Sequence, residues 1–334
     1  MQEDRRSNSR HNKSDGVGIS IAWRVLLFIH AALTLLISAM MIASYPLGAY
    51  LVFHTSMGSG YREPLDGFYM LVPLPIQIQA SISIGDLFIL LWCTYLLLFT
   101  LLLLSPKNML SAILRLVRKG DDGYSSSSSN NSINSSSNYL ITTIAWFSIL
   151  VASSIAIDLL QNMLGIEMGS IEYEDRLKHF VDATTAPLRE ELGFRMILIG
   201  VPAYLFLARQ GSTLLNVLWR PYEHLSRHGK SIHLLIVASA LLFGLAHVLF
   251  STGWSYGKVT QATLGGIILG WLYYRYGLHA AVIAHWAANY LPLTYLFAGD
   301  AFGSDAMLNM LELVLVSNGI VAISLRLRAY FKSQ

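Results

Sequence analysis

Arg189-Glu190-Glu191-Leu192-Gly193-Phe194-Arg195 places four charged side chains inside residues 183–208, a stretch that otherwise has the composition of a membrane-spanning helix. Charged side chains at bilayer depth are costly and mark a functional site by default. Glu191 and Arg195 are four residues apart and share a helical face, so each can neutralise the other. Glu190 lies about 100° round the helix without that partner, as a general base requires. The alternative is a purely structural ionic clamp between helices.

The composition of the whole chain is that of an integral membrane protein. Of the 334 residues, 54% are hydrophobic and 13% are charged, whereas soluble domains carry about 25% charged residues. The mean hydropathy is +0.50. The net charge of +3 is small and reflects basic loops, so it does not indicate a nucleic-acid surface. The single cysteine, Cys93, lies in an apolar run and excludes a disulfide framework.

Apolar segments predict an all-α fold, a polytopic bundle of about eight transmembrane helices. The segments are 19–43, 84–104, 139–164, 183–208, 231–250, 259–276, 280–297 and 306–325. Residues 45–82 hold too many Gly and Pro residues for a simple span, and we expect a short interfacial helix or a re-entrant segment there. Residues 109–119 predict an amphipathic basic helix on the membrane surface.

The distribution of Lys and Arg predicts the orientation. With the N-terminus in the cytoplasm, 16 of the 23 Lys and Arg residues lie in cytoplasmic segments and 4 in outer segments. The other three, Arg24, Arg189 and Arg195, lie in or at the end of spans. We therefore expect a multi-pass protein of the cell membrane with both termini in the cytoplasm.

Two further apolar segments carry polar side chains. His247 lies near the end of the segment 231–250, in Phe243-Gly244-Leu245-Ala246-His247. His285 and Asn289 lie four residues apart in the segment 280–297, so both project from one helical face. A lone histidine in a helix is usually structural, but Glu, two His and Asn on three separate spans each cost free energy in lipid unless they face a polar interior.

Two chemistries suit this set of side chains. A carboxylate, a second titratable group and hydrogen-bond donors can activate water and stabilise an oxyanion. One Glu and two His are also familiar Zn²⁺ ligands. The residues alone leave both readings open.

Three motifs, in order, carry a family resemblance: Glu190-Glu191-x-x-x-Arg195, Phe243-x-x-x-His247 and His285-x-x-x-Asn289. They resemble the motifs of the CPBP family, the CAAX-protease and bacteriocin-processing group of intramembrane endopeptidases, also called Abi. The glycine-rich segment 265–277 also resembles the family's helix and tight turn before the third motif. The resemblance covers about residues 180–295, and the long basic loop 209–230 departs from it.

The resemblance implies a hydrolytic site: Glu190 would activate water with help from His247, His285 and Asn289 would bind the oxyanion, and Glu191 and Arg195 would hold the geometry. Family members have been described both as metalloproteases and as metal-independent glutamate proteases. We expect no obligatory cofactor, with Zn²⁺ held by Glu190, His247 and His285 as the alternative. The expected partners are the bilayer and a membrane-associated protein or peptide substrate, with or without a prenyl group, and no nucleic acid; the sequence indicates no oligomeric state.

The predicted organisation has four regions. These are a disordered basic N-terminal tail (1–17), an N-terminal transmembrane region (18–164) with a Ser/Asn-rich loop (121–138), a CPBP-like catalytic core (165–298), and a final transmembrane helix with a basic tail (299–334). Two other functions would use the same buried polar residues. A proton-coupled transporter would relay protons through them, although no repeat or broken helix is visible. A non-catalytic membrane scaffold would keep the fold alone.

Overall fold

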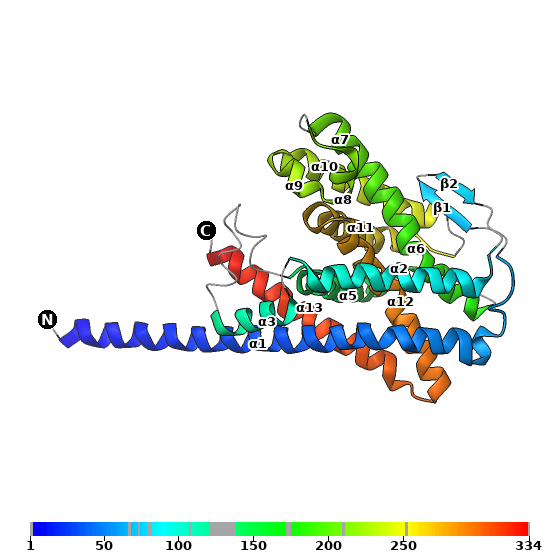
Figure 1. Ribbon diagram of the computed structural model, residues 1–334. Coiled ribbons are helices and arrows are strands. Elements are labelled where there is room, and N and C mark those ends of the chain that lie inside the picture. The colour runs from blue at the N-terminus through cyan, green and yellow to red at the C-terminus, as the bar shows by residue number, and fades with distance from the viewer. Residues whose placement is uncertain are drawn as a thin grey trace.

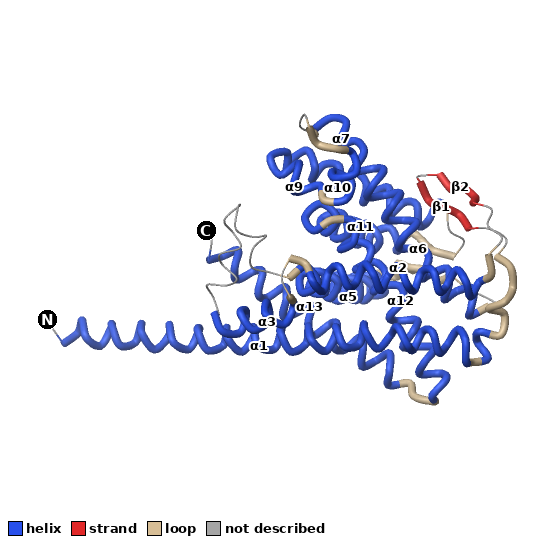
Figure 2. Tube along the Cα trace, viewed as in Figure 1, coloured by secondary structure: helices blue, strands red, loops and turns tan. Residues whose placement is uncertain are grey.

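The computed structural model describes residues 3–65, 68–72, 74–78, 82–106, 108–119, 138–171, 175–208, 211–250 and 253–332. Helices dominate this part of the chain (Figure 2), which confirms the all-α prediction. The long helices are α1 (Glu3–His54), α2 (Ile84–Leu104), α5 (Tyr139–Met163), α6 (Arg176–Glu191), α10 (Gly229–Leu249), α11 (Gly257–Tyr276), α12 (Leu278–Phe302) and α13 (Ala306–Lys332). The shorter ones are η1 (Ser56–Gly58), α3 (Met109–Lys119), the π-helical segment η4 (Leu192–Gly200), α7 (Val201–Leu207), α8 (Leu214–Trp219), α9 (Pro221–Leu225) and η5 (Ser226–His228).

Helix α12 lies at the centre of the bundle. It packs against α6, α11, α5, α13 and α1, and every residue from Gly277 to Ala287 is buried. Alanines at 280, 281, 284 and 287 are fully buried and let the neighbouring helices approach closely. The α1, α5 and α13 helices form one side of the molecule in Figure 1, and α6 to α11 form the other. His285 and Asn289, the residues of the third motif, are on α12 and therefore lie where the two sides meet.

The outer helices keep large apolar side chains on their outward faces. Examples on α1, α2, α10 and α13 are Phe28, Leu97, Leu234 and Leu313, each more than 60% exposed. Such faces suit contact with lipid, because contiguous apolar surface of this kind is rare on soluble proteins. The chain is thus an integral membrane protein.

Among the described residues, five helical segments are long and apolar enough to cross a membrane: Ile21–His54, Ile84–Leu114, Tyr139–Met163, Pro221–Leu249 and Ala306–Phe331. The other three predicted spans, 183–208, 259–276 and 280–297, are also helical. These three segments carry more polar or charged side chains than the other five, so their mean hydropathy is lower or their charge is higher. Helix α12 is in addition surrounded by protein. The predicted count of eight spans is therefore not established.

Two segments differ from the expectation. Residues 68–72 and 74–78 form an antiparallel pair of strands, β1 (Phe68–Val72) and β2 (Leu74–Ile78), with Tyr69 opposite Gln77; the prolines of this segment concealed the strand pattern. Helix α1 begins at Glu3 and continues past Pro46 to His54, so residues 3–17, expected to be disordered, are helical. No proline lies in the chain before Pro46, and α1 extends beyond the other elements in Figure 1. Most of the predicted Ser/Asn-rich loop, residues 121–137, lies outside the described residues.

Glycines on α11 bring α10 close to it. A Cβ at Gly266 would lie 2.8 Å from the Cα of Ala240, and one at Gly270 would lie 2.8 Å from Ile236 Cγ2. The small-residue pair therefore packs against α10, as helix pairs with such motifs do. Gly277, with φ of +96°, then turns the chain into α12. Helix α11 thus joins the helix that carries His247 to the helix that carries His285.

Candidate functional site

The motif Glu190-Glu191-x-x-x-Arg195 lies where α6 passes into η4. Residues 176–207 form one continuous helical rod, whose middle part is π-helical. π-Helical turns have a wider hydrogen-bond pattern and are frequent at functional sites. Ser239 on α10 donates to the carbonyl oxygen of Phe194 at 2.7 Å and so fixes the π-helical segment against α10. The two carboxylates are therefore held at the end of a regular helix, directly before a segment tied to its neighbour.

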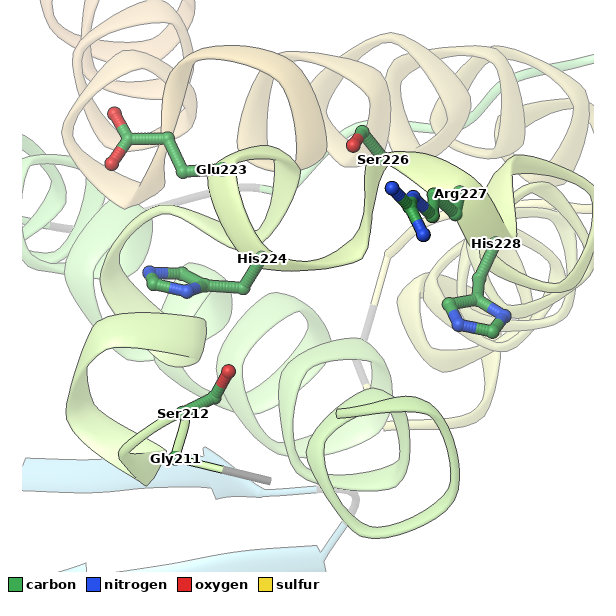
Figure 3. A pocket seen from close by; sticks show the side chains of 7 residues that line it. All are labelled: Gly211, Ser212, Glu223, His224, Ser226, Arg227 and His228. Carbon is green, nitrogen blue, oxygen red and sulfur yellow. The ribbon is translucent and has the colours of Figure 1, made fainter. Parts of the chain in front are cut away.

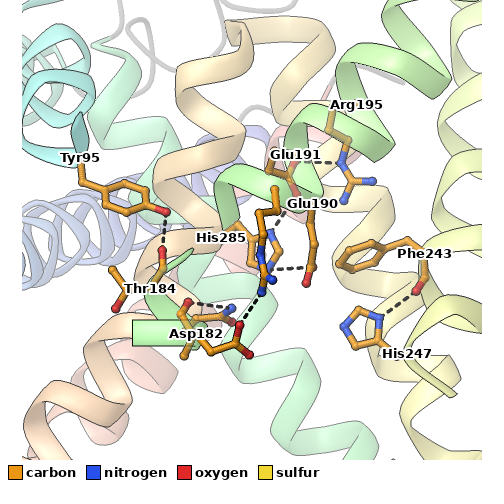
Figure 4. A network of polar contacts seen from close by, with 12 residues as sticks. Tyr95, Asp182, Thr184, Glu190, Glu191, Arg195, Phe243, His247 and His285 are labelled. Carbon is orange, nitrogen blue, oxygen red and sulfur yellow. Dashed lines mark hydrogen bonds and ion pairs between the residues drawn. The ribbon is translucent and has the colours of Figure 1, made fainter. Parts of the chain in front are cut away.

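Glu191 is the buried centre of an ionic triad. Its Oε2 lies 3.0 Å from Arg195 Nε, and both side chains are 0% exposed. Its Oε1 accepts a hydrogen bond from His285 Nδ1 at 2.9 Å (Figure 4). This arrangement confirms the predicted pairing of Glu191 with Arg195. It also makes Glu191 the residue that orients the His285 ring.

Glu190 has a different environment. Its side chain is 15% exposed, and Oε2 lies 3.6 Å from His285 Nε2. That distance is too long for a hydrogen bond, and Oε2 is buried with no hydrogen-bond partner in the described part of the chain. The structure thus has the predicted difference between the two carboxylates: Glu191 is paired with Arg195, and Glu190 is not. His285 lies between them, 8% exposed and facing the protein.

His247 approaches from α10. Its Nδ1 lies 2.8 Å from the carbonyl oxygen of Phe243. A carbonyl oxygen only accepts, so Nδ1 carries the proton of the neutral ring and Nε2 is left as an acceptor. Figure 4 shows His247 and Phe243 next to the Glu190 side chain.

The Phe243 ring links the three motifs. It lies 4.8 Å under the guanidinium carbon of Arg195, 4.6 Å from the His247 ring and 5.9 Å from the His285 ring, the last two centroid to centroid and edge-on. Cation–π contact with a desolvated guanidinium stabilises by about 2 kcal/mol. Phe243 therefore covers the side of the charged cluster that faces α10.

Asn289 reaches α6 at a point where a carbonyl group lacks its usual donor. Pro187 has no N–H, so the carbonyl oxygen of Ala183 cannot accept its α-helical hydrogen bond. Asn289 Nδ2 lies 3.5 Å from that oxygen, at the long end of the hydrogen-bond range. At the next residue of the same helix, Tyr95 donates to the carbonyl oxygen of Thr184 at 2.6 Å (Figure 4). Asn289 thus faces α6 about two turns before Glu190.

The residues do not form a three-ligand metal site. Glu190 Oε2 lies 3.6 Å from His285 Nε2, but the described residues include no group of three or more His, Cys, Asp or Glu side chains placed to hold a metal ion. The predicted zinc set of Glu190, His247 and His285 does not fit a Zn²⁺ ion in this arrangement, because a catalytic zinc takes three protein ligands at about 2.0–2.2 Å.

A hollow of about 410 Å³ lies elsewhere, in the basic segment 209–230 (Figure 3). Its lining comprises Gly211, Ser212, Glu223, His224, Ser226, Arg227 and His228. It shares no residue with the carboxylate–histidine cluster. The cluster is therefore the stronger candidate for chemistry, since it combines buried charge with convergent titratable groups and this hollow does not.

The second motif contains Phe243, but the sequence predicts no role for this residue. The sequence also gives no prediction for Ser239 or Tyr95. Phe243 lies four residues before His247 on the same helical face, and that spacing is a usable signal. Ser239 lies one further turn back, in an apolar segment. Tyr95 gives no comparable signal, because nothing in its neighbourhood distinguishes it from other lipid-facing or core aromatics.

Fold and site together define a predominantly helical integral membrane protein with a carboxylate–histidine cluster inside its bundle. Residues 176–291 match the family model for type II CAAX prenyl endopeptidase Rce1-like proteins. This region is similar to the CAAX-protease family, and the match confirms the resemblance that the three motifs indicate. No curated protein and no solved structure matches the chain.

Proposed function

We propose that this protein is an endopeptidase that hydrolyses a peptide bond of a membrane-associated, CAAX-type protein, with Glu190 as the general base. The observation that carries the proposal is the contrast between adjacent carboxylates: Glu191 forms an ion pair with Arg195 and accepts a hydrogen bond from His285, whereas Glu190 Oε2 has neither a hydrogen-bond partner nor a closer ion-pair contact than His285 Nε2 at 3.6 Å among the described residues. A general base must have an oxygen free to take a proton. The family match supports this class of reaction.

The proposed reaction begins with a water molecule between Glu190 and the scissile carbonyl. Glu190 takes one proton while the water oxygen forms a bond to the carbonyl carbon, and His247 Nε2 accepts a hydrogen bond from the same water. The carbonyl oxygen becomes an oxyanion. When the C–N bond breaks, Glu190 returns the proton to the leaving nitrogen, and a carboxylic acid and an amine result.

His285 and Asn289 stabilise the oxyanion in this scheme. Asn289 has two N–H groups, and only one reaches Ala183. His285 donates through Nδ1 to Glu191, so it donates through Nε2 only when both ring nitrogens carry protons.

Cleavage of a labelled peptide library by the purified, reconstituted protein tests the proposal. General-base catalysis contributes about 10²- to 10⁴-fold, so we expect Glu190→Gln to lower turnover by that factor and to leave the fold intact. Glu312→Gln, on the exposed face of α13, is the matched control and keeps wild-type turnover. A folded wild-type protein that cleaves no peptide would exclude the endopeptidase and favour a scaffold or a transporter. Equal rates for Glu190→Gln and wild type would show that Glu190 is not the base. Loss of turnover in Glu191→Gln alone would show that Glu191 is the base and that Glu190 has the orienting role.

We also propose that the protein lies in the cell membrane with both termini in the cytoplasm, and that the site opens in the outer half of the bilayer. The distribution of Lys and Arg supports this orientation. An Ala183→Cys variant, with the exposed Cys93 replaced by Ser, tests it. Labelling of intact cells by a membrane-impermeant thiol reagent is expected; labelling only after the cells are opened would invert the topology.

A further inference from the structure

Lys258 lies beside the candidate site and has no part in the proposed hydrolysis. It is the second residue of α11, where that helix crosses the end of α10. The crossing is tight, because a Cβ at Gly244 would lie 2.8 Å from the carbonyl oxygen of Val259. His247 is three residues after Gly244 on α10. Lys258 therefore starts its helix next to the turn that carries His247.

Specific contacts hold the Lys258 side chain in place. Its Nζ lies 4.0 Å from the centroid of the Trp254 ring and donates to Gln261 Oε1 at 2.8 Å. The loop before α11 is itself fixed, since Gln161 donates to the carbonyl oxygen of Gly257 at 2.9 Å and Gly169 pairs with Trp254. An ammonium group with three donors thus has a defined position and uses only one of them on a neutral amide.

The ammonium group has no carboxylate in contact with it. Among the described residues, no Asp or Glu oxygen lies within 4.0 Å of Lys258 Nζ. The charges of Glu190 and Asp158 act on it from further away. Burial lowers the pKa of Lys258 to about 8, which leaves it mainly protonated at neutral pH. A partly buried cation without a contacting anion, next to a candidate catalytic carboxylate, can bind an anionic ligand that enters between them.

The substrate of the proposed function brings such an anion. A CAAX-type protein ends three residues after its modified cysteine, and its chain end is a carboxylate. Three extended residues span about 10 Å, so a carboxylate lies near any bond that is cut after that cysteine. A carboxylate at membrane depth is costly unless a cation pairs with it.

We propose that Lys258 binds the C-terminal carboxylate of the substrate and so sets the distance between the cleaved bond and the chain end. This inference rests on the proposed endopeptidase function. It makes Lys258 a specificity-determining residue: it would select free chain ends over internal peptide bonds of similar sequence.

Two peptides that are identical except for a free carboxylate or an amide at the C-terminus test the inference. The measurement is kcat/KM for each, with the full-length protein in vesicles. A hydrogen bond to a charged group is strong enough for about 10- to 100-fold preference, so we expect wild type to prefer the free acid by that factor. Lys258→Met should bring the ratio close to one, Lys258→Arg should keep most of it, and Lys230→Met, an exposed lysine at the start of α10, should keep all of it.

The outcomes separate the two proposals. Cleavage of both peptides at equal rates by wild type would overturn the role of Lys258 and leave the endopeptidase intact, and it needs no variant. Equal slowing of both peptides in Lys258→Met would show a structural role and would also overturn the inference. If wild type cleaves neither peptide nor any member of the library, the proposed function fails and this inference fails with it.

Discussion

Replacement of Arg195 by Met tests how the buried ionic triad contributes to stability. Arg195 and Glu191 are both 0% exposed and lie 3.0 Å apart, Nε to Oε2. Met fills much of the same space, so the main change is that the Glu191 carboxylate loses its cation and keeps only the hydrogen bond from His285. Removal of one partner from a buried ion pair costs about 3–5 kcal/mol. That is a large share of the roughly 5–15 kcal/mol by which proteins are stable.

The double variant Glu191→Gln/Arg195→Met separates lost charge from lost packing. It removes both charges, and a buried pair replaced by neutral side chains is often close to neutral in stability. We expect it to recover most of the loss seen in Arg195→Met. Unfolding in mixed detergent micelles, followed by circular dichroism, gives all the free energies of a double-mutant cycle.

Arg176→Met is the matched control. Arg176 pairs with Asp300 at 2.7 Å, a shorter distance than that of the buried pair, but the two side chains are 62% and 41% exposed. Exposed pairs contribute about 0–1 kcal/mol, so this variant should change stability by less than about 1 kcal/mol. An Arg195→Met variant as stable as Arg176→Met, or a double variant no more stable than Arg195→Met, would refute the reasoning that burial decides the effect.

Three other predictions concern the helix packing, the metal and pH. Gly266→Val should destabilise the fold and lower turnover, because a Cβ there meets Ala240 Cα at 2.8 Å and must push α10 and α11 apart. An unchanged free energy of unfolding would contradict that contact. Gly229→Ala is the control, because a Cβ at Gly229 meets nothing within 4 Å. Incubation with 1,10-phenanthroline should leave cleavage unchanged, whereas loss of activity that Zn²⁺ restores would reinstate the metal. The preference for a free C-terminal carboxylate should fall as pH rises through about 8, because Lys258 then loses its proton. Burial lowers the pKa of Lys258 to this value, and the charges of Glu190 and Asp158 oppose the effect. A preference that stays constant from pH 6 to 10 would contradict a role of Lys258 in carboxylate binding.

The pairing within α6 and η4 was predictable because it depends on helical period alone. Glu191 and Arg195 meet whether the intervening turn is α-helical or, as here, π-helical in part. The position of His285 against both carboxylates was not predictable at that level, since it depends on how α12 lies against α6. Burial of α12 explains the outcome: this helix packs against α1, α2, α5, α6, α8, α11 and α13, so the His285 side chain points into protein.

Asn289 illustrates a signal that was present but unused. Pro187 lies inside the charged helix, and its missing N–H identifies the carbonyl of Ala183 as an acceptor in need of a donor. A polar side chain on a neighbouring helix was the expected donor, and the third motif holds one. The strand pair of β1 and β2 shows the opposite case: Pro73 and Pro75 weaken every strand signal in that segment, so only the folded chain reveals the pairing.

In the proposed mechanism, two consecutive carboxylates allow a single helix both to hold a histidine and to leave a base free. Successive residues on a helix differ by about 100° in direction, so one carboxylate faces Arg195 and His285 while its neighbour faces the side where His247 and Lys258 lie. If one glutamate served both purposes, the hydrogen bonds that fix His285 would also stabilise its ionised form and make it a poorer base. The adjacent pair separates these demands: Glu191 has the ion pair at 3.0 Å and the hydrogen bond at 2.9 Å, and Glu190, 3.6 Å from the same imidazole, keeps the oxygen that we propose binds water.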